Sequence, residues 1–261
     1  MIEHVEFSSE QATLRGLLFR PESSPRPPVV IMAHGTSATI HMVADEYAEV
    51  FRRDGMAVLL YDHRNFGASE GEPRQEINPW IQCRGYLDAI DFVQTVDGID
   101  HDRIGLWGDS YSAGEVMVVG AIDERVTAIV AQIPVCGQAP PTFEPTRATF
   151  DAIRASLLSG DVAGGPDVTL GPLPVVSPDQ LGTPSLLEPV QAFRWFIDYG
   201  ARHGTGWLNR VTRVLPDTPV AYNPARSARP PDISPDTRCV MPESLTANRA
   251  GNVPRSERQC S

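Results

Sequence analysis

The stretch Arg103-Ile-Gly-Leu-Trp-Gly-Asp-Ser-Tyr-Ser-Ala-Gly114 decides the fold, because an apolar run ends there abruptly at a serine between very small residues. Ile104–Trp107 has the length and composition of a short buried strand, and the residues after the serine those of the apolar start of a helix. Gly108 precedes Ser110 by two positions, and Ser112 stands where the G-x-S-x-G pattern has its second glycine. The stretch therefore predicts a strand–turn–helix corner with Ser110 at its tip.

Such a corner has a chemical use. It lifts the Ser110 hydroxyl above the sheet edge and places it at a helix N-terminus, where backbone N–H groups and the helix dipole stabilise a developing oxyanion. We therefore interpret Ser110 as a candidate nucleophile. The alternative interpretation is an ordinary strand-to-helix corner that carries a solvent-exposed serine.

The sequence on either side of the corner alternates between strand and helix patterns. Residues 3–8 and 13–19 alternate in polarity and predict an antiparallel pair at a sheet edge. Apolar runs of strand length occur at 29–33, 56–61, 104–107 and 126–133, and helical spacing occurs at 42–53, 79–96 and 113–121. This order predicts an α/β fold with a doubly wound, mostly parallel sheet, in which ligands bind at the carboxyl ends of the strands.

Charge argues against several classes of function. The formal net charge of −11 disfavours nucleic acid and anionic membranes as partners, since both bind basic surfaces. All 22 basic residues are arginine, and the absence of lysine excludes a Schiff-base mechanism and a lysine base. The sequence leaves the oligomeric state open.

Cysteine spacing and apolar patterning indicate neither a metal site nor a membrane segment. No apolar stretch reaches the roughly 18 residues that a membrane span needs, and the first residues do not form a secretory signal pattern. We therefore expect a cytoplasmic protein without metal or cofactor. The four cysteines, none of them in C-x-x-C spacing, are Cys83, Cys136, Cys239 and Cys260.

Three motifs in chain order resemble the α/β-hydrolase superfamily, and within it the dienelactone-hydrolase-like and X-Pro-peptidase-like serine hydrolases. They are the apolar strand ending in His34-Gly35, the loop Asp62-x-Arg64-x-x-Gly67-x-Ser69-x-Gly71, and the corner Gly108-Asp109-Ser110. The likeness covers about residues 1–137. It implies the α/β-hydrolase fold and a serine nucleophile, and it says little about the substrate.

The resemblance also implies roles for single residues. Ser110 is the nucleophile, and the backbone N–H groups of Thr36 and Tyr111 form the oxyanion hole. The expected activity is that of a carboxylesterase or thioesterase that cleaves small esters or thioesters. The expected partner is accordingly a small-molecule substrate, with no nucleic acid or membrane.

Four polar residues of these motifs are expected to act structurally rather than chemically. In this superfamily the histidine before the glycine usually braces its loop, so His34 is expected to do so. Asp62 and Arg64 are interpreted as an ion pair that holds the loop after the second central strand. Asp109 is interpreted as a neighbour that orients the corner, not as the acid of a catalytic triad.

The second half of the chain breaks the strand–helix rhythm. We predict three regions: an α/β-hydrolase core at 1–137, a cap at 138–223, and an irregular tail at 224–261 that is a remnant of the C-terminal core. The cap is predicted to hold helices at 143–158 and 189–202, with a Pro- and Gly-rich lid between them at 160–184. The aromatic residues of the second helix are interpreted as lining an acyl or alcohol pocket or as packing the cap onto the sheet, and the second role does not exclude the first.

The tail poses the main difficulty, because a serine triad needs a base and an acid downstream of the nucleophile. His203 is the one histidine after Ser110, and it follows a cap helix rather than a core strand. Glu243 is a weak candidate for the acid, with Ser244 in the place of a lost aspartate as the other possibility. We expect missing or degenerate last strands, from truncation or a reading-frame change near residue 230, or else a histidine supplied by unusual topology.

Two functional hypotheses follow. The first is a serine hydrolase impaired by a missing C-terminal histidine, with weak or no esterase turnover. The second is a non-catalytic binding or interaction protein with the α/β-hydrolase fold.

Overall fold

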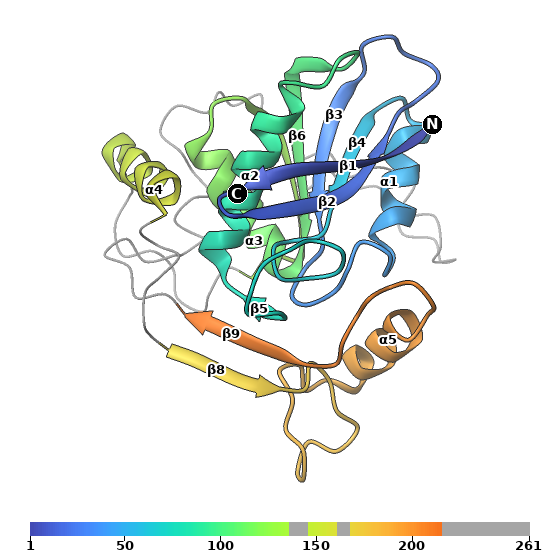
Figure 1. The fold of residues 1–261 in the computed structure, drawn as a ribbon, viewed down its shortest axis with the longest axis vertical. Helices are drawn as coiled ribbons and strands as arrows, with labels where there is room; N and C mark the ends of the chain where they lie inside the picture. The colour runs from blue at the N-terminus through green and yellow to red at the C-terminus, as the bar shows by residue number, and fades with distance from the viewer. Residues whose placement is uncertain (136–145, 161–167, 216–261) are drawn as a thin grey trace, which may run out of the picture.

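The computed structural model describes residues 1–135, 146–160 and 168–215 of the chain. Its main element is a six-stranded sheet in the order β1-β2-β4-β3-β6-β7, in which β4, β3, β6 and β7 run parallel and β2 is antiparallel to both of its neighbours (Figure 1). This arrangement confirms the predicted mostly parallel sheet with an antiparallel pair at its edge. The strands are β1 (Ile2–Ser9), β2 (Ala12–Phe19), β3 (Pro28–Ala33), β4 (Ala57–Tyr61), β6 (Asp100–Asp109) and β7 (Val126–Gln132).

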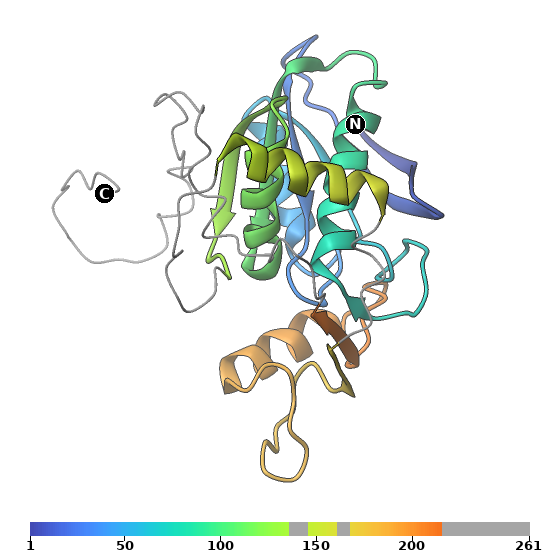
Figure 2. The same cartoon turned by 90° about the vertical axis from the view of Figure 1, so that its left-hand side faces the viewer.

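Helices cover both faces of this sheet. On one face α1 packs with residues 44, 48 and 51 against Met32 and Leu60. On the other face α2, α3 and α4 share one apolar cluster with Ile31 and Leu59, and α4 lies across α2 and α3 (Figure 2). The helices are α1 (Ala44–Arg53), α2 (Pro79–Val93), α3 (Ser110–Ile122) and α4 (Arg147–Ser159).

Burial on both faces explains why the central strands read as unbroken apolar runs. In β3, Val29 and Ile31 point toward α2 and α3, whereas Val30 and Met32 point toward α1. A strand with one polar face would leave one helix layer without an apolar surface to cover. The start of α2 is equally well specified, since Asn78 Oδ1 accepts the Trp80 N–H at 3.1 Å and Pro79 occupies the first turn.

A second, smaller sheet lies beyond the carboxyl ends of the central strands (Figures 1 and 2). Its order is β5-β9-β8, with β9 parallel to β5 and antiparallel to β8, and α5 packs beside it. We call β8, α5, β9 and the segments between them the cap. The elements are β5 (Glu76–Ile77), β8 (Val168–Leu173), α5 (Val190–Gly200) and β9 (Val211–Leu215).

The cap differs from the helical insertion expected from the sequence. The predicted second helix is present as α5, but β8 lies inside the stretch interpreted as a lid, and β9 has no counterpart in the prediction. The physical reason is that both strands are short: β9 pairs with β5, which precedes it by more than 130 positions, and β8 pairs in turn with β9. Local periodicity cannot detect a strand whose pairing partner is that remote.

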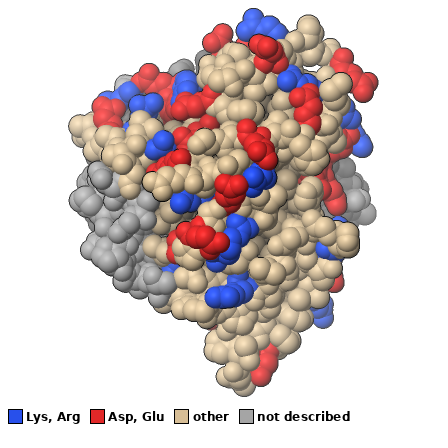
Figure 3. Space-filling view, viewed as in Figure 1, with Lys and Arg blue, Asp and Glu red and all other residues tan. Residues whose placement is uncertain are grey.

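The described residues contain no helix with the length and apolar character that crossing a membrane requires. On the face seen in Figure 3, acidic and basic side chains are intermixed over the upper part, and the lower part over the cap shows few charges. No large single-sign patch is visible on that face.

Candidate active site

Ser110 stands at the corner between β6 and α3, with its backbone in the left-handed region at φ 51°. A non-glycine residue in that region is strained, by about 1–2 kcal/mol, and persists only where its surroundings enforce it. A Cβ added to Gly108 would overlap the carbonyl oxygen of Ser112, so the corner tolerates no side chain there. The residue itself remains partly exposed. The structure thus has the sharp corner that the sequence predicts.

The loop after β3 meets this corner because β3 and β6 are neighbouring parallel strands with Ala33 opposite Gly108. Gly35 lies so close that an added Cβ would overlap the carbonyl oxygen of Asp109. Thr36 follows, partly exposed and also left-handed, at φ 46°. Among the described residues the Thr36 N–H has no hydrogen-bond acceptor. This amide is therefore free to bind a ligand oxygen.

Tyr111 supplies the other expected amide. It lies in the first turn of α3, where backbone N–H groups have no acceptor within the helix. Its partly buried ring packs against the apolar cluster of the cap, and the Arg213 guanidinium lies 5.4 Å from the ring centroid. Burial raises the pKa of the Tyr111 phenol, and the cationic Arg213 opposes that rise.

Asp109 points from the corner toward the loop after β3. Its Oδ1 accepts the Gly35 N–H at 2.7 Å. Burial raises the pKa of the Asp109 carboxyl from 3.8 to about 6, although the hydrogen bond from Gly35 acts in the opposite direction. This contact is the one expected of a residue that orients the corner.

A buried polar layer lies beneath the corner. The Ser112 hydroxyl donates to the His34 carbonyl oxygen at 2.6 Å and lies 2.8 Å from His63 Nε2. Glu115 Oε2 is 3.4 Å from the same His63 nitrogen, and both side chains are fully buried. Burial lowers the pKa of His63 and raises the pKa of Glu115, because a charged form of either side chain would lose its hydration there.

The sequence analysis missed His63 and Glu115. His63 occupies a position that the Asp62-x-Arg64 motif leaves unspecified, so the motif did not single it out. Glu115 carried a usable signal, because a carboxyl inside the apolar start of a helix needs a polar partner. His34 is expected to hold its loop in place. In the structure its Nε2 accepts the backbone N–H of His63 at 3.3 Å, which ties the loop after β3 to the loop after β4.

The predicted ion pair between Asp62 and Arg64 is wrong. Asp62 is buried and accepts the backbone N–H groups of Ile40 at 3.0 Å and Ala68 at 2.9 Å. Arg64 instead pairs with Glu10 in the β1–β2 turn at 3.2 Å. The loop folds over Asp62, and backbone amides rather than a guanidinium satisfy the buried carboxylate.

All six histidines of the sequence lie among the described residues, and none of them forms a hydrogen bond with Ser110 there. His34 and His63 are buried below the corner. His203 is exposed in the turn after α5, where the structure gives it no contact with the corner. The other three are His4 on β1, His41 beside Asp45, and His101 bonded to the Val96 carbonyl.

Other expectations for the acid and the tail remain predictions. Glu243, Ser244 and the whole of 224–261 lie outside the described residues. Among the residues that the structure does describe, no group of three His, Cys, Asp or Glu side chains is placed to hold a metal ion.

The aromatic residues of α5 pack among themselves and against the core. The Trp195 and Phe196 ring centroids are 4.8 Å apart, and Phe196 and Trp207 are 5.5 Å apart. They share an apolar cluster with Phe66 and Val211. The contacts agree with the interpretation that these aromatic residues pack the cap onto the core. Their role in lining a pocket stays a prediction.

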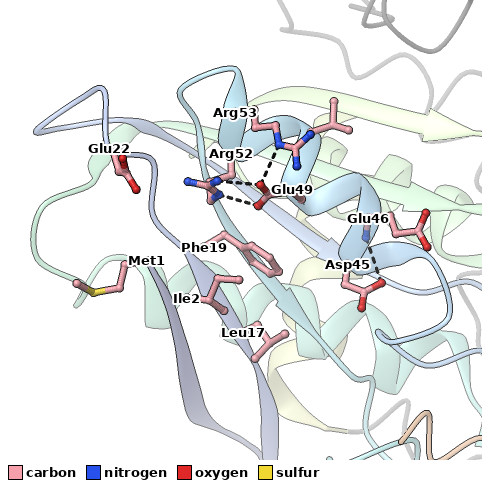
Figure 4. A pocket seen from close by; sticks show the side chains of 11 residues that line it. Met1, Ile2, Leu17, Phe19, Glu22, Asp45, Glu46, Glu49, Arg52 and Arg53 are labelled. Atoms are coloured by element: carbon pink, nitrogen blue, oxygen red, sulfur yellow. Dashed lines mark hydrogen bonds and ion pairs between the residues drawn. The ribbon is translucent and has the colours of Figure 1, made fainter. Parts of the chain in front are cut away.

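A groove of about 810 Å³ lies away from the corner, between α1 and the β1–β2 pair (Figure 4). Ile2, Leu17 and Phe19 form its floor, and Glu49 on its wall binds both Arg52 and Arg53. These two guanidinium groups lower the pKa of Glu49 to about 2. The groove includes none of the residues of the corner.

Comparison with known proteins agrees with this geometry. The family model described as X-Pro dipeptidyl-peptidase (S15 family) matches residues 12–142, half of the chain. The match contains the loop after β3, the loop after β4 and the corner at Ser110.

Two fungal thiohydrolases are similar in sequence. That of Aspergillus aculeatus is 43% identical over 121 residues, which are 46% of this chain and 37% of the relative. That of Eupenicillium brefeldianum is 35% identical over 173 residues, which are 66% of this chain and 54% of the relative. In these matches the chain spans about half or less of the relatives' length.

A solved α/β-hydrolase from Penicillium sp. sh18 is similar in structure. The TM-score is 0.60 at 26% sequence identity, and the match covers 81% of this chain and 70% of that chain. The shared fold places the corner within a hydrolase scaffold.

Proposed function

Because this chain belongs to the X-Pro dipeptidyl-peptidase (S15) family of the α/β-hydrolase superfamily, we propose that it is a serine hydrolase that cleaves small esters or thioesters through an acyl-enzyme on Ser110. The observation that carries the proposal is the strained, partly exposed Ser110 at a corner where bulk is excluded. The thiohydrolase names of the two relatives favour esters and thioesters over the peptides in the family's description.

In the proposed reaction Ser110 Oγ attacks the carbonyl carbon of the substrate. The carbonyl oxygen gains the negative charge and is bound by the backbone N–H groups of Thr36 and Tyr111. The bond from the carbonyl carbon to the alcohol or thiol then breaks, the leaving group takes a proton from solvent water, and a second water hydrolyses the acyl group from Ser110. The free Thr36 amide and the first-turn position of Tyr111 support this assignment.

The proton of Ser110 is the weak point of this mechanism. A triad histidine normally accepts it, and losing one triad member lowers turnover by several orders of magnitude. Since none of the six histidines bonds to Ser110 among the described residues, we expect the proton to pass to solvent hydroxide. We therefore expect slow turnover that rises with pH.

The same observation favours an alternative function. Without an activated serine, the chain would be a non-catalytic α/β-hydrolase-fold protein that binds a ligand at the carboxyl edge of the sheet. The two proposals differ in whether Ser110 reacts with a substrate carbonyl.

Hydrolysis of p-nitrophenyl acetate and labelling by a fluorophosphonate separate the two proposals. The hydrolase proposal expects slow turnover and slow labelling, both absent in Ser110→Ala. The control variant is Ser9→Ala, which removes a buried hydroxyl on β1. Ser112→Ala does not serve as a control, because the Ser112 hydroxyl bonds to the loop beside the corner. Identical traces for wild type and Ser110→Ala would favour the binding protein. Robust turnover that depends on Ser110 would contradict the impaired triad.

A further inference from the structure

We propose that Ser112 is a positioning residue, whose hydroxyl, held by His63, fixes the peptide group between His34 and Gly35 and thereby sets the Thr36 amide beside Ser110. The inference rests on the proposed function, in which that amide binds the oxyanion. It concerns buried polar groups to which the proposed reaction assigns no step.

The two hydrogen bonds from the corner meet one peptide group. The Ser112 hydroxyl donates to the His34 carbonyl oxygen at 2.6 Å, and Asp109 Oδ1 accepts the Gly35 N–H at 2.7 Å. This carbonyl and this N–H belong to the same planar peptide unit and point in opposite directions. Binding at both ends fixes the rotation of the plane relative to the corner.

The next peptide group is held by a hydrogen bond of its own. Its carbonyl oxygen, on Gly35, accepts the Ala38 N–H at 3.1 Å, and its N–H is the free amide of Thr36. Gly35 joins the two planes, and glycine restricts their relative rotation least of all residues. The hydrogen bonds at the planes must therefore supply the rigidity that the residue lacks.

The contact with His63 orients the Ser112 hydroxyl. The hydroxyl has one hydrogen, which goes to the His34 carbonyl, so the contact at 2.8 Å requires His63 to donate from Nε2. Ser112 is 1% exposed and His63 is fully buried, so water does not replace either partner. Glu115, 3.4 Å from His63 Nε2, adds a second oxygen beside this donor.

The inference has a measurable consequence for Ser110. In Ser112→Ala the peptide group keeps only its bond to Asp109, so the Thr36 amide is placed less well. We expect the maximal rate of fluorophosphonate labelling of Ser110 to fall about tenfold, less than the 10²–10³ typical of deleting an oxyanion donor. The half-saturating concentration of the reagent and the melting temperature should change little.

Matched variants separate positioning from general damage. Ser9→Ala removes a hydroxyl of similar burial on β1 and should label at the wild-type rate. His63→Leu removes the donor to Ser112 and should slow labelling, whereas His63→Gln keeps an N–H near the Nε2 position and should recover most of the rate. Ser112→Ala combined with His63→Leu should be no slower than the slower single variant, because both changes break one chain of contacts.

Hydrogen–deuterium exchange tests the same inference without any reaction of Ser110. Peptides that cover residues 34–40 should exchange faster in Ser112→Ala than in wild type or Ser9→Ala. If wild-type Ser110 proves inert, the acyl-enzyme proposal fails while this exchange result still decides the positioning inference. Unchanged exchange in Ser112→Ala, or labelling equal to that of Ser9→Ala, would overturn it.

Discussion

The two sides of the Ser110 corner are held in different ways. Below it, hydrogen bonds join three buried residues, His34, His63 and Ser112. Above it, the cap rests largely on aromatic packing around Phe196 and Trp207. Directional bonds fix the positions of atoms, whereas apolar contacts add stability without fixing orientation. The corner is therefore positioned by directional contacts within the core, and the cap is held mainly by apolar packing.

The largest expected effect tests the cap. Phe196 is 6% exposed and contacts both Trp195 and Trp207, so Phe196→Ala should cost about 3 kcal/mol of local stability. Hydrogen exchange should accelerate in α5, β8 and β9 and stay unchanged in β3 and β6. Leu208→Ala, at a side chain 55% exposed, is the control. Equal acceleration in the core strands would contradict the separation of the two regions.

The next effect concerns the approach of β3 to the corner. In Gly35→Ala the new methyl group meets the carbonyl oxygen of Asp109, and the strands must move apart. We expect a loss of about 2–3 kcal/mol in urea unfolding, as for other overpacked sites. Gly105→Ala is the matched control, because the nearest atom to its Cβ lies at 3.8 Å. Equal stability of the two variants would show that the loop is looser than we infer.

A smaller effect, which depends on pH and makes the variant the more stable protein, should come from Asp109. Its folded pKa of about 6 exceeds its usual 3.8, so the folded state binds more protons, and stability falls as the pH rises between these values. Asp109→Asn keeps an oxygen for the Gly35 N–H but removes the charge. We expect equal stabilities near pH 4 and a variant more stable by about 2 kcal/mol at pH 7.

Urea titrations of wild type and Asp109→Asn at several pH values measure this difference. A gap that does not change with pH would mean that Asp109 keeps its ordinary pKa.

The smallest effect belongs to the contact between the two regions. Arg213→Met removes the cation above the Tyr111 ring but keeps much of the apolar stem, and should cost about 1 kcal/mol. Arg210→Met, at an exposed position of the same segment, should leave the melting temperature unchanged. If the two variants match, packing alone holds the cap over Tyr111.

Much of the core could be predicted because its signals are local. The apolar runs of β3 and β4, the start of α2 at Asn78 and Pro79, and the small residues around Ser110 each specify their own conformation. The strand β9 and the hydrogen bond from Ile40 to Asp62 could not, because each depends on a contact between separate segments of the chain. The local sequence around a short strand or a single carboxylate does not indicate which group from another segment will pair with it.

The sequence by itself determined the alternation of strands and helices and the serine at the corner. Only the tertiary structure decided which polar groups meet beneath that serine. The Ser112 hydroxyl contacts a carbonyl 78 positions earlier and an imidazole 49 positions earlier. Packing three strands side by side brings these groups together, and no local pattern encodes that meeting.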